Sequence, residues 1–465
     1  MTMVKKTESA NSQFYKFLWA FILVALSACL GNVVDGIIVG NLINADGVSA
    51  INLSKPIIQF IFTINLLICG GGGMLVGFEL GNNNIGGAKR CFTDSMVLST
   101  SFGVLLTIFG GFIFPAQIAN MLCDNEVILP LARDYMEVLL IGNPTYILMW
   151  GLSTMVSVNG APRLVSAAVI IDNTVNLLLD IVFIKYFGWG IMGSSTATIV
   201  GHIVGIAILL SHWLKPANRR LSLSFSLGDF WKSTKRILAQ GAPLAVASIC
   251  LTMLLLSANS IVLSTAGRDG IFIFSVCMNL LQIYNLFLSG ACQTLQSLGA
   301  IEAGKRSQTG LQFVIRKTFR FMTVSMIATC IYVWVLPQTI AELFGANEPQ
   351  LISGCNHALR VFALSFVPFC YIYLLMIVYK LYGHHRMALF ISFALSLTVI
   401  PVLWAMAKFT PSLMWYSYLV AYALEGIAIY IFHKSTHVEF IIDNTTESDD
   451  TPSAADTIRH SKTAE

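Results

Sequence analysis

The chain has 465 residues, of which 56% are hydrophobic and only 11% are charged, and its mean hydropathy is +0.73. Soluble domains carry about 25% charged residues, so this composition excludes an ordinary soluble protein and indicates a polytopic membrane protein. The net charge of +4 is small and is informative only through its distribution. The ten cysteines are scattered without a CxxC pair, which argues against a disulfide framework and against a zinc or iron–sulfur site.

Apolar stretches long enough to cross a bilayer recur along the whole chain. About 20 mainly apolar residues span the hydrocarbon core as a helix, and twelve stretches meet this requirement. In chain order they cover residues 14–41, 47–80, 89–114, 129–158, 162–185, 188–213, 237–265, 270–300, 311–338, 349–380, 385–408 and 411–433. The second, fourth, eighth and tenth are longer than a span needs, so we expect them to tilt or to extend beyond the bilayer.

The basic residues fall mostly on one side of this arrangement. If the N-terminus is placed inside the cell, most of the 28 Lys and Arg residues lie on inner connections and inner helix ends. Because positively charged segments stay in the cytoplasm, both termini are predicted to be cytoplasmic. Residues 1–13 would form a cytosolic N-terminal segment, and the polar residues 434–465 would form a disordered cytosolic tail.

Sequence features of the first half recur in the second half. Two glycines five residues apart and a following Lys-Arg pair occur in both halves, as Gly81, Gly86 and Lys89-Arg90 and as Gly299, Gly304 and Lys305-Arg306. Asp46-Gly47 likewise returns as Asp269-Gly270. Several recurrences at nearly the same offset indicate a duplication, and six spans per half make the repeat parallel. The predicted fold is all-α, with twelve transmembrane helices in two pseudo-symmetric six-helix lobes. The N-lobe, the basic cytosolic linker and the C-lobe cover residues 14–213, 214–236 and 237–433.

Three polar side chains follow one another through the apolar stretch Val169–Ile184. Asp172, Asn176 and Asp180 are spaced four residues apart, so on a helix they form a stripe about 12 Å long on one face. A carboxylate in hydrocarbon costs at least ~2.5 kcal/mol on insertion scales. This face is therefore expected to meet protein, water or a ligand, which points toward ion handling inside the membrane.

A second buried acid lies at the same predicted depth as Asp180. Asp35 and Asp180 are both near the outer ends of their spans. Two such carboxyl groups can share a proton, because repulsion and desolvation disfavour two buried charges. The same pair in its ionised form can bind Na⁺ together with hydroxyl and amide oxygens. The alternative is a polar pair that only locks two helices, but intramembrane acids are functional by default.

The neighbouring polar residues leave alternatives open. Asn176 either supplies an amide oxygen to an ion or bridges two helices. Thr198, in the stretch 188–213, is a candidate hydroxyl ligand, although threonine in a membrane helix commonly bonds back to its own i−4 carbonyl. Asp172 either relays protons toward the cytoplasm or makes a helix-packing contact, and the packing contact is slightly favoured.

Two further charged residues are secondary candidates. Lys55 could neutralise Asp35, contact an anionic substrate group or extend to the membrane interface, and the last option is favoured. Glu425 lies deep in the last stretch and is a candidate second functional acid. The 30 Phe and 17 Met residues suit cavities for lipophilic cations, although lipid-facing helices use the same residues. No phosphate-binding motif and no nucleophile–base set occurs, so neither an enzyme nor a cofactor is predicted.

Six segments carry a resemblance to a known family. They are NVVDGIIVGNL around Asp35, INLSKP, ELGNNNIGGAKR, VNGAPR, NTVNLLLDIVFIKYFGWGIMGSSTATIVG and LGAIEAGKR. Together they resemble the multidrug and toxin extrusion (MATE) family of transporters, and the pattern of the first half is similar to the DinF-like branch of that family. The resemblance extends over residues 14–433, which is nearly the whole chain.

The resemblance implies two six-helix lobes around a central cleft, alternating access, and export of lipophilic or cationic organic compounds in exchange for H⁺ or Na⁺. It also implies an ion or proton site formed by the side chains Asp35, Asn176, Asp180 and Thr198. The NorM-like branch carries further acids in the spans that correspond to 237–265 and 349–380, where this chain has none. Lys55 replaces the neutral residue that is usual in the family before the proline of INLSKP, which leaves the charge of the substrate open.

The main alternative is a flippase for lipid-linked oligosaccharides from the related superfamily. Such a protein would need a cleft lined by several Arg and Lys residues to hold pyrophosphate, and only Lys55 and Arg360 are candidates here. We therefore expect a monomeric secondary antiporter in a bacterial inner membrane. Its expected partners are small organic molecules and membrane lipids, and nucleic acid is not among them.

Overall fold

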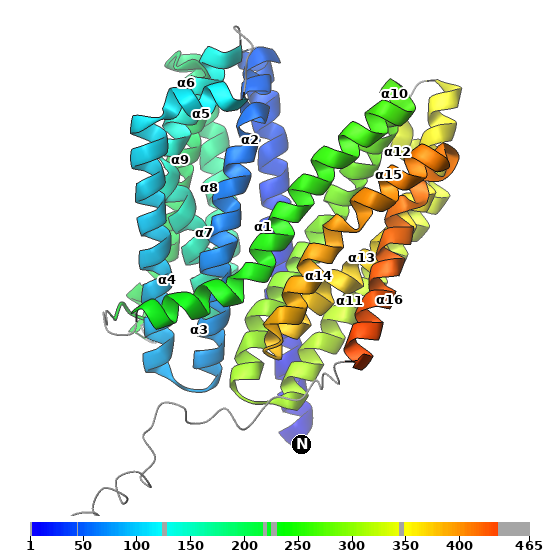
Figure 1. Ribbon diagram of the computed structural model, residues 1–465. Helices are drawn as coiled ribbons and strands as arrows, with labels where there is room; N and C mark the ends of the chain where they lie inside the picture. Colours follow the sequence, from blue (N-terminus) through cyan, green and yellow to red (C-terminus); the bar gives the residue numbers. More distant parts are fainter. Residues whose placement is uncertain are drawn as a thin grey trace, which may run out of the picture.

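The computed structural model describes residues 2–43, 45–122, 128–216, 221–224, 230–343 and 348–435, and within these ranges it contains helices and no strand. Two bundles stand side by side and diverge toward one end (Figure 1). The first bundle contains α2 (Ala45–Asn65), η1 (Leu66–Gly70), α3 (Gly71–Gly81), α4 (Ile85–Leu106), η2 (Thr107–Ile113), α5 (Pro115–Leu122), α6 (Ile128–Ile141), α7 (Asn143–Val158), α8 (Pro162–Ile181), η3 (Val182–Tyr186), α9 (Gly190–Leu210) and η4 (Ser211–Leu214). The second contains most of α10 (Phe230–Gly304) with α11 (Gln308–Val335), α12 (Pro337–Leu343), α13 (Pro349–Leu381), α14 (His385–Leu397), α15 (Val399–Phe409), η7 (Pro411–Tyr416) and α16 (Ser417–Ser435). The first helix, α1 (Thr2–Leu42), packs against α8 of one bundle and α10 of the other.

The predicted number of spans is confirmed by the described residues. Eleven helices are long and apolar enough to cross a membrane, and the pair α6–α7, bent by 52°, supplies a twelfth. The bend falls at Gly142, inside the predicted stretch 129–158. The long helix α10 contains two spans that meet at Gly267, whose φ of 61° lies in the left-handed region that favours glycine.

The ends of the predicted segments differ from the structure in two places. Helix α1 begins at Thr2, so residues 2–13 of the predicted N-terminal segment belong to the first helix, because no Gly or Pro interrupts them. Helix α10 begins at Phe230, inside the predicted linker 214–236. The backbone N–H of Ser224 in this linker donates a hydrogen bond of 2.8 Å to Thr93 Oγ1 of α4. The predicted disordered tail lies outside the described residues from position 436 onward.

Glycines bring the two bundles together backbone to backbone. A Cβ on Gly241 of α10 would collide with the carbonyl oxygen of Leu67 in η1, and a Cβ on Gly304 would collide with that of Phe78 in α3. Small residues allow helix backbones to approach this closely. The second span of the first half is therefore packed tightly against α10, at the lower end of the molecule in Figure 1.

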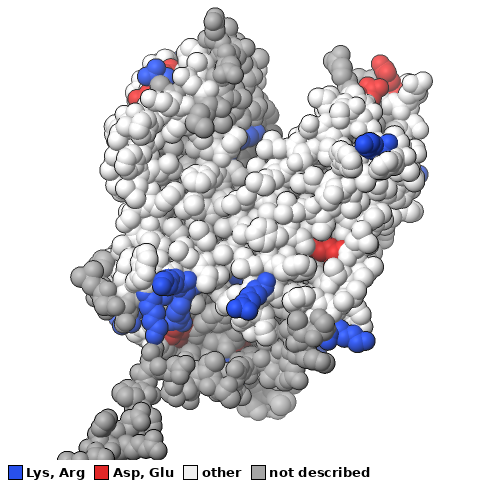
Figure 2. All heavy atoms as spheres, in the orientation of Figure 1, with Lys and Arg blue, Asp and Glu red and all other residues white. Residues whose placement is uncertain are grey.

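The surface of the molecule is hollowed between the bundles. Figure 2 shows a V-shaped notch that opens at the end away from the N-terminus. Several Lys and Arg side chains gather toward the opposite end, whereas the visible surface between the two ends is mostly uncharged. One end of the molecule is thus open and the other is closed.

Candidate functional site

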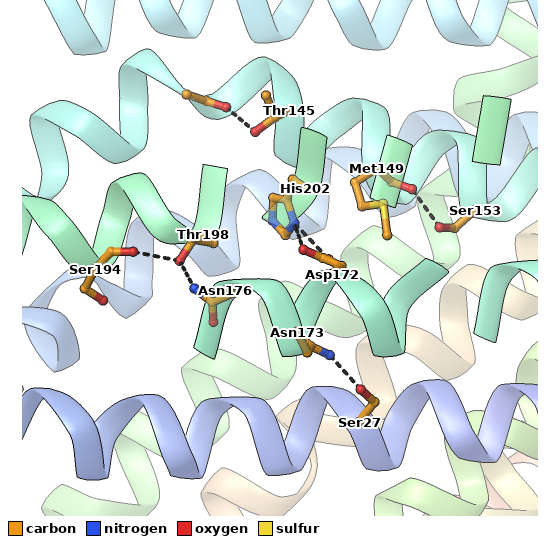
Figure 3. A network of polar contacts seen from close by, with 11 residues as sticks. Ser27, Thr145, Met149, Ser153, Asp172, Asn173, Asn176, Ser194, Thr198 and His202 are labelled. Carbon is orange, nitrogen blue, oxygen red and sulfur yellow. Dashed lines mark hydrogen bonds and ion pairs between the residues drawn. The ribbon is translucent and has the colours of Figure 1, made fainter. Parts of the chain in front are cut away.

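The candidate site is built on α8 and α9, which run antiparallel and are connected through η3. Each helix presents three polar side chains to the other at intervals of four residues, so facing pairs stay in register from one turn to the next. We name these pairs the outer, middle and inner rungs. They are, in that order, Asp180 with Ser194, Asn176 with Thr198, and Asp172 with His202. Figure 3 shows the middle and inner rungs together with Ser194.

The outer rung recruits Asp35 from α1. The Ser194 hydroxyl donates a hydrogen bond of 3.2 Å to Asp35 Oδ1. The Asp180 carboxyl group lies beside the Asp35 carboxyl and the Ser194 hydroxyl. Asp180 is fully buried, and Asp35 is half-buried. Two acids that are far apart in the sequence are therefore brought together, as the sequence predicted from their depth.

The outer rung places two carboxyl groups close together in a largely buried position. With both acids ionised, neither Asp180 oxygen receives a hydrogen-bond donor from the described residues, and two like charges repel in a site with little hydration. One proton shared between the two carboxyl groups would supply the missing donor. A Na⁺ ion would instead offset one of the two charges, and it would rely on hydroxyl and amide oxygens nearby. The described residues contain no group of three or more His, Cys, Asp or Glu side chains that could hold a metal ion.

The middle rung connects the two helices. Asn176 Nδ2 donates a hydrogen bond of 3.1 Å to Thr198 Oγ1, and that hydroxyl donates one of 3.1 Å to the carbonyl oxygen of Ser194. The second bond is the i−4 back-bond that is typical of threonine in membrane helices. Tyr146 of α7 packs against the same face of α9, with 4.4 Å between its ring centroid and that of His202. Asn176 and Thr198 thus bridge helices in this state, directly beside the acid pair.

The inner rung is an acid–histidine pair. His202 Nδ1 lies 3.1 Å from Asp172 Oδ1 and 3.0 Å from Asp172 Oδ2. Both residues are buried, at 4% exposure for Asp172 and 9% for His202. Gly201 and Gly205 leave room for the Asp172 side chain, because a Cβ on Gly201 would stand 2.7 Å from Asp172 Oδ1. The sequence alone gives no partner for Asp172, and in the structure His202 is that partner.

Sequence reasoning missed three of these residues. Ser194, Tyr146 and His202 were not singled out, yet Ser194, Thr198 and His202 repeat the four-residue spacing of the stripe on α8. This repeated spacing is a sequence signal that could have identified Ser194 and His202. Tyr146 lies on α7 and carried no comparable signal.

The two secondary candidates lie away from the rungs. Lys55 is exposed on α2 and is not among the described groups that act on Asp35. Glu425 lies in α16 of the other bundle, where it is 1% exposed and both carboxylate oxygens are buried without a hydrogen-bond partner. The structure therefore brings four of the seven predicted residues together in the outer and middle rungs, and a fifth, Asp172, forms the inner rung.

A cavity of about 80 Å³ lies between the two bundles. It is lined by aromatic and apolar side chains together with neutral polar groups, and none of its lining residues is charged. Phe62 and Trp150 form an edge-to-face pair with 5.3 Å between ring centroids. The amides of Asn65, Gln293 and Gln296 lie in the same wall. This wall is made by the second and fourth spans of the first half and by α10 of the second.

Comparison with known proteins places these observations in a family. The family model MatE matches residues 20–182 and 243–405, one segment in each half of the chain. The multidrug export protein MepA of Staphylococcus aureus (strain bovine RF122 / ET3-1) is 23% identical over 428 residues, which cover 90% of this chain and 93% of MepA.

Solved structures share the fold. A mutant of the Vibrio cholerae MATE transporter VcmN superimposes with a TM-score of 0.84 at 19% identity and covers 93% of this chain and 98% of its own. A multidrug resistance MATE family transporter of the MOP superfamily in an outward-facing conformation gives a TM-score of 0.82 at 17% identity and covers 92% of this chain and 96% of its own. Because the family model matches both halves, the chain belongs to the MATE family of membrane transporters and is not an enzyme.

Proposed function

We propose that this transporter exports lipophilic organic cations in exchange for H⁺, with Asp35 and Asp180 as the coupling site. The observation that carries the proposal is the outer rung, where a fully buried carboxyl group faces a second carboxyl group and receives no donor while both are ionised. Such a pair takes up one proton readily, because the shared proton removes the repulsion and supplies the hydrogen bond.

The shape of the molecule supports alternating access. We infer that the end with the gathered basic residues faces the cytoplasm, since positive segments remain inside. Both termini are then cytoplasmic, and the notch opens to the outside of what we take to be a bacterial inner membrane. The open state would admit protons to Asp35 from outside, because that carboxyl group is only half-buried.

Exchange requires that proton and substrate favour different states of the protein. A proton at the outer rung removes one of the two negative charges of the acid pair and lets α1, α8 and α9 pack more closely, which favours release of the organic cation to the outside. Loss of the proton to the cytoplasmic side restores the charge and the affinity for the next cation. We propose a monomer with the two lobes 14–213 and 237–433 as the moving units.

The central cavity supports a lipophilic cation as the substrate class. Phe62 and Trp150 offer ring faces and edges for cation–π contacts, and the amide oxygens of Gln293 and Gln296 can accept hydrogen bonds. No acid lines this cavity, so a cation with delocalised charge is favoured over a compact ammonium group. The absence of a basic residue from the same lining counts against a flippase that holds a pyrophosphate group.

Flux into proteoliposomes tests the proposal. A pH gradient and a Na⁺ gradient are imposed separately on vesicles that contain the full chain, with the ethidium cation as the probe. We expect transport to follow the pH gradient and to be lost in Asp35→Asn and in Asp180→Asn. Transport that follows only the Na⁺ gradient would assign the outer rung to Na⁺, and full activity of both variants would reject the site.

A further inference from the structure

The inner rung has no role in the coupling step just described. Asp172 lies eight residues from Asp180 on the same helix, which corresponds to about 12 Å toward the cytoplasmic side. It is buried, and its partner His202 comes from the neighbouring helix. An acid–histidine pair in this position needs its own explanation.

Helix packing alone does not account for this pair. A buried ion pair is weak evidence for stability, because the loss of hydration offsets the attraction between the charges. Neutral amides or hydroxyls hold helices together at lower cost, and α8 uses one at the adjacent residue. There the Asn173 amide donates a hydrogen bond of 2.8 Å to the Ser27 hydroxyl of α1. The choice of an acid and a histidine one residue away points to proton chemistry.

The geometry fixes which nitrogen of His202 is free. Nδ1 faces both oxygens of Asp172 at 3.0 and 3.1 Å, so it carries the hydrogen that is donated to the carboxylate. In the neutral ring Nε2 is then the unprotonated nitrogen, and among the described residues it is buried without a hydrogen-bond partner. A proton that arrives at Nε2 produces an imidazolium ion beside a carboxylate, so the pair can accept one proton without leaving an isolated charge.

Hydroxyl groups lie between the inner and outer rungs. Thr198 is one helical turn from both Ser194 and His202, and it bonds to Asn176 of the middle rung. The Tyr146 ring packs edge-on against His202 with 4.4 Å between centroids, which brings a further hydroxyl-bearing side chain to the inner rung. The two rungs are therefore joined by side chains that can both donate and accept a hydrogen bond.

We propose that Asp172 and His202 form a second proton-binding site that receives the coupling proton from the outer rung and passes it to the cytoplasmic side. This inference rests on the proposed function. In the transfer step the acid pair of the outer rung loses one proton and gains one negative charge, while His202 Nε2 gains that proton and one positive charge. His202 then loses the proton to water that enters from the inner side, and the neutral ring is restored.

Few other charged groups face this site. Tyr146 of α7 and Tyr135 of α6 come from the helices packed against α9, Asp35 comes from α1, and Asp180 lies farther along α8. Among the described residues, the ion pairs that involve Lys or Arg lie elsewhere, at Arg236–Glu79 and Lys305–Glu302. Among the described residues, Asp172 is therefore the charged side chain that pairs with His202.

The experiment measures transport of ethidium in proteoliposomes with one known orientation of the full chain. The outer pH is held constant, and the pH on the cytoplasmic side is varied between about 6 and about 8, the range in which histidine titrates. The variant His202→Gln keeps an amide that can bond to Asp172 but cannot carry a proton. We expect the transport rate to fall by at least about tenfold, which is a smaller factor than a fully positioned proton-transfer group contributes. The rate should also no longer depend on the inner pH. Ethidium binding to the detergent-solubilised protein should be unchanged.

The matched control is Asn173→Ala, which removes a polar helix contact at the same depth without removing a titratable group. It should keep the inner-pH dependence of the wild type. If His202→Gln folds poorly, the double variant Asp172→Asn/His202→Gln provides a neutral hydrogen-bonded pair for the same measurement. A wild-type inner-pH profile in these variants, with Asp35→Asn still inactive, would overturn the second site and leave the outer site standing. Full activity of Asp35→Asn would instead reject the proposed function.

Discussion

Gly81 of α3 and Gly304 of α10 touch backbone to backbone at the closed end of the molecule. A Cβ built on Gly81 would stand 2.8 Å from the Cα of Gly304. Each glycine belongs to the motif that recurs in the two halves, so the repeat places small residues on both sides of one contact. The close contact of the two backbones at this end depends on the absence of side chains at these two positions.

The variant Gly304→Leu should disfavour the outward-open state. The added side chain would meet the backbone of Phe78, and overpacking of this kind costs about 1–3 kcal/mol. The population should shift toward a state in which α3 and α10 are separated at this end, and transport should be slower. Distances between spin labels on α3 and α10 measure this shift. Gly86→Leu is the control, because a Cβ at Gly86 has no neighbour closer than 3.7 Å. Equal distances in the wild type and in Gly304→Leu would contradict the prediction.

The variant Ser194→Ala should make the outer rung bind its proton more tightly. The Ser194 hydroxyl donates to Asp35 and so favours the ionised carboxylate. Hydrogen bonds to charged groups contribute about 1.5–3 kcal/mol, and about 1.4 kcal/mol corresponds to one pH unit. The outer pH that gives half-maximal transport should therefore rise by about one unit. Ser195→Ala is the control, since among the described residues Ser195 bonds only to the carbonyl of Met192 on its own helix. A midpoint that falls or stays constant would count against the assignment.

Most of the fold could be predicted from hydropathy, because a bilayer requires a fixed length of apolar helix. The twelve predicted stretches correspond to the spans of the structure, including the bent pair α6–α7. The start of α1 at Thr2 was not predicted, because residues 2–13 are polar and hydropathy registers only the apolar part of a helix. The start of α10 at Phe230 was missed for the same reason.

The candidate site was predictable only in part. The depth and the four-residue spacing of Asp172, Asn176 and Asp180 identified one face of α8. The partner of Asp172 depends on the register between α8 and α9. The four-residue spacing within one helix does not reveal how two helices are aligned. His202 is one of eight histidines in the chain, and only helix packing distinguishes it from the others.

Glu425→Gln should leave transport intact. Glu425 is buried in α16 and receives no hydrogen bond from the described residues, and the main contacts of α16 are with other helices of its own bundle. The neutral amide has nearly the same shape, so we expect transport within about twofold and a change in the free energy of unfolding below ~1 kcal/mol. Glu425→Ala should cost about 2–4 kcal/mol by leaving a cavity. Loss of pH-driven transport in a well-folded Glu425→Gln protein would instead identify a second functional acid.

Trp150→Ala should weaken binding of lipophilic cations without changing the coupling to protons. The Trp150 ring forms part of the central cavity and packs against Phe62, and a cation–π contact contributes about 0.5–2 kcal/mol. The apparent affinity for ethidium should fall between about twofold and about thirtyfold, and Trp150→Phe should recover part of the loss. Trp189→Ala is the control, because Trp189 stacks on Phe183, packs in a tilted orientation against Phe187 and does not line the cavity. Equal losses in Trp150→Ala and Trp189→Ala would show that the binding site lies elsewhere, because only the first ring faces the cavity between the bundles.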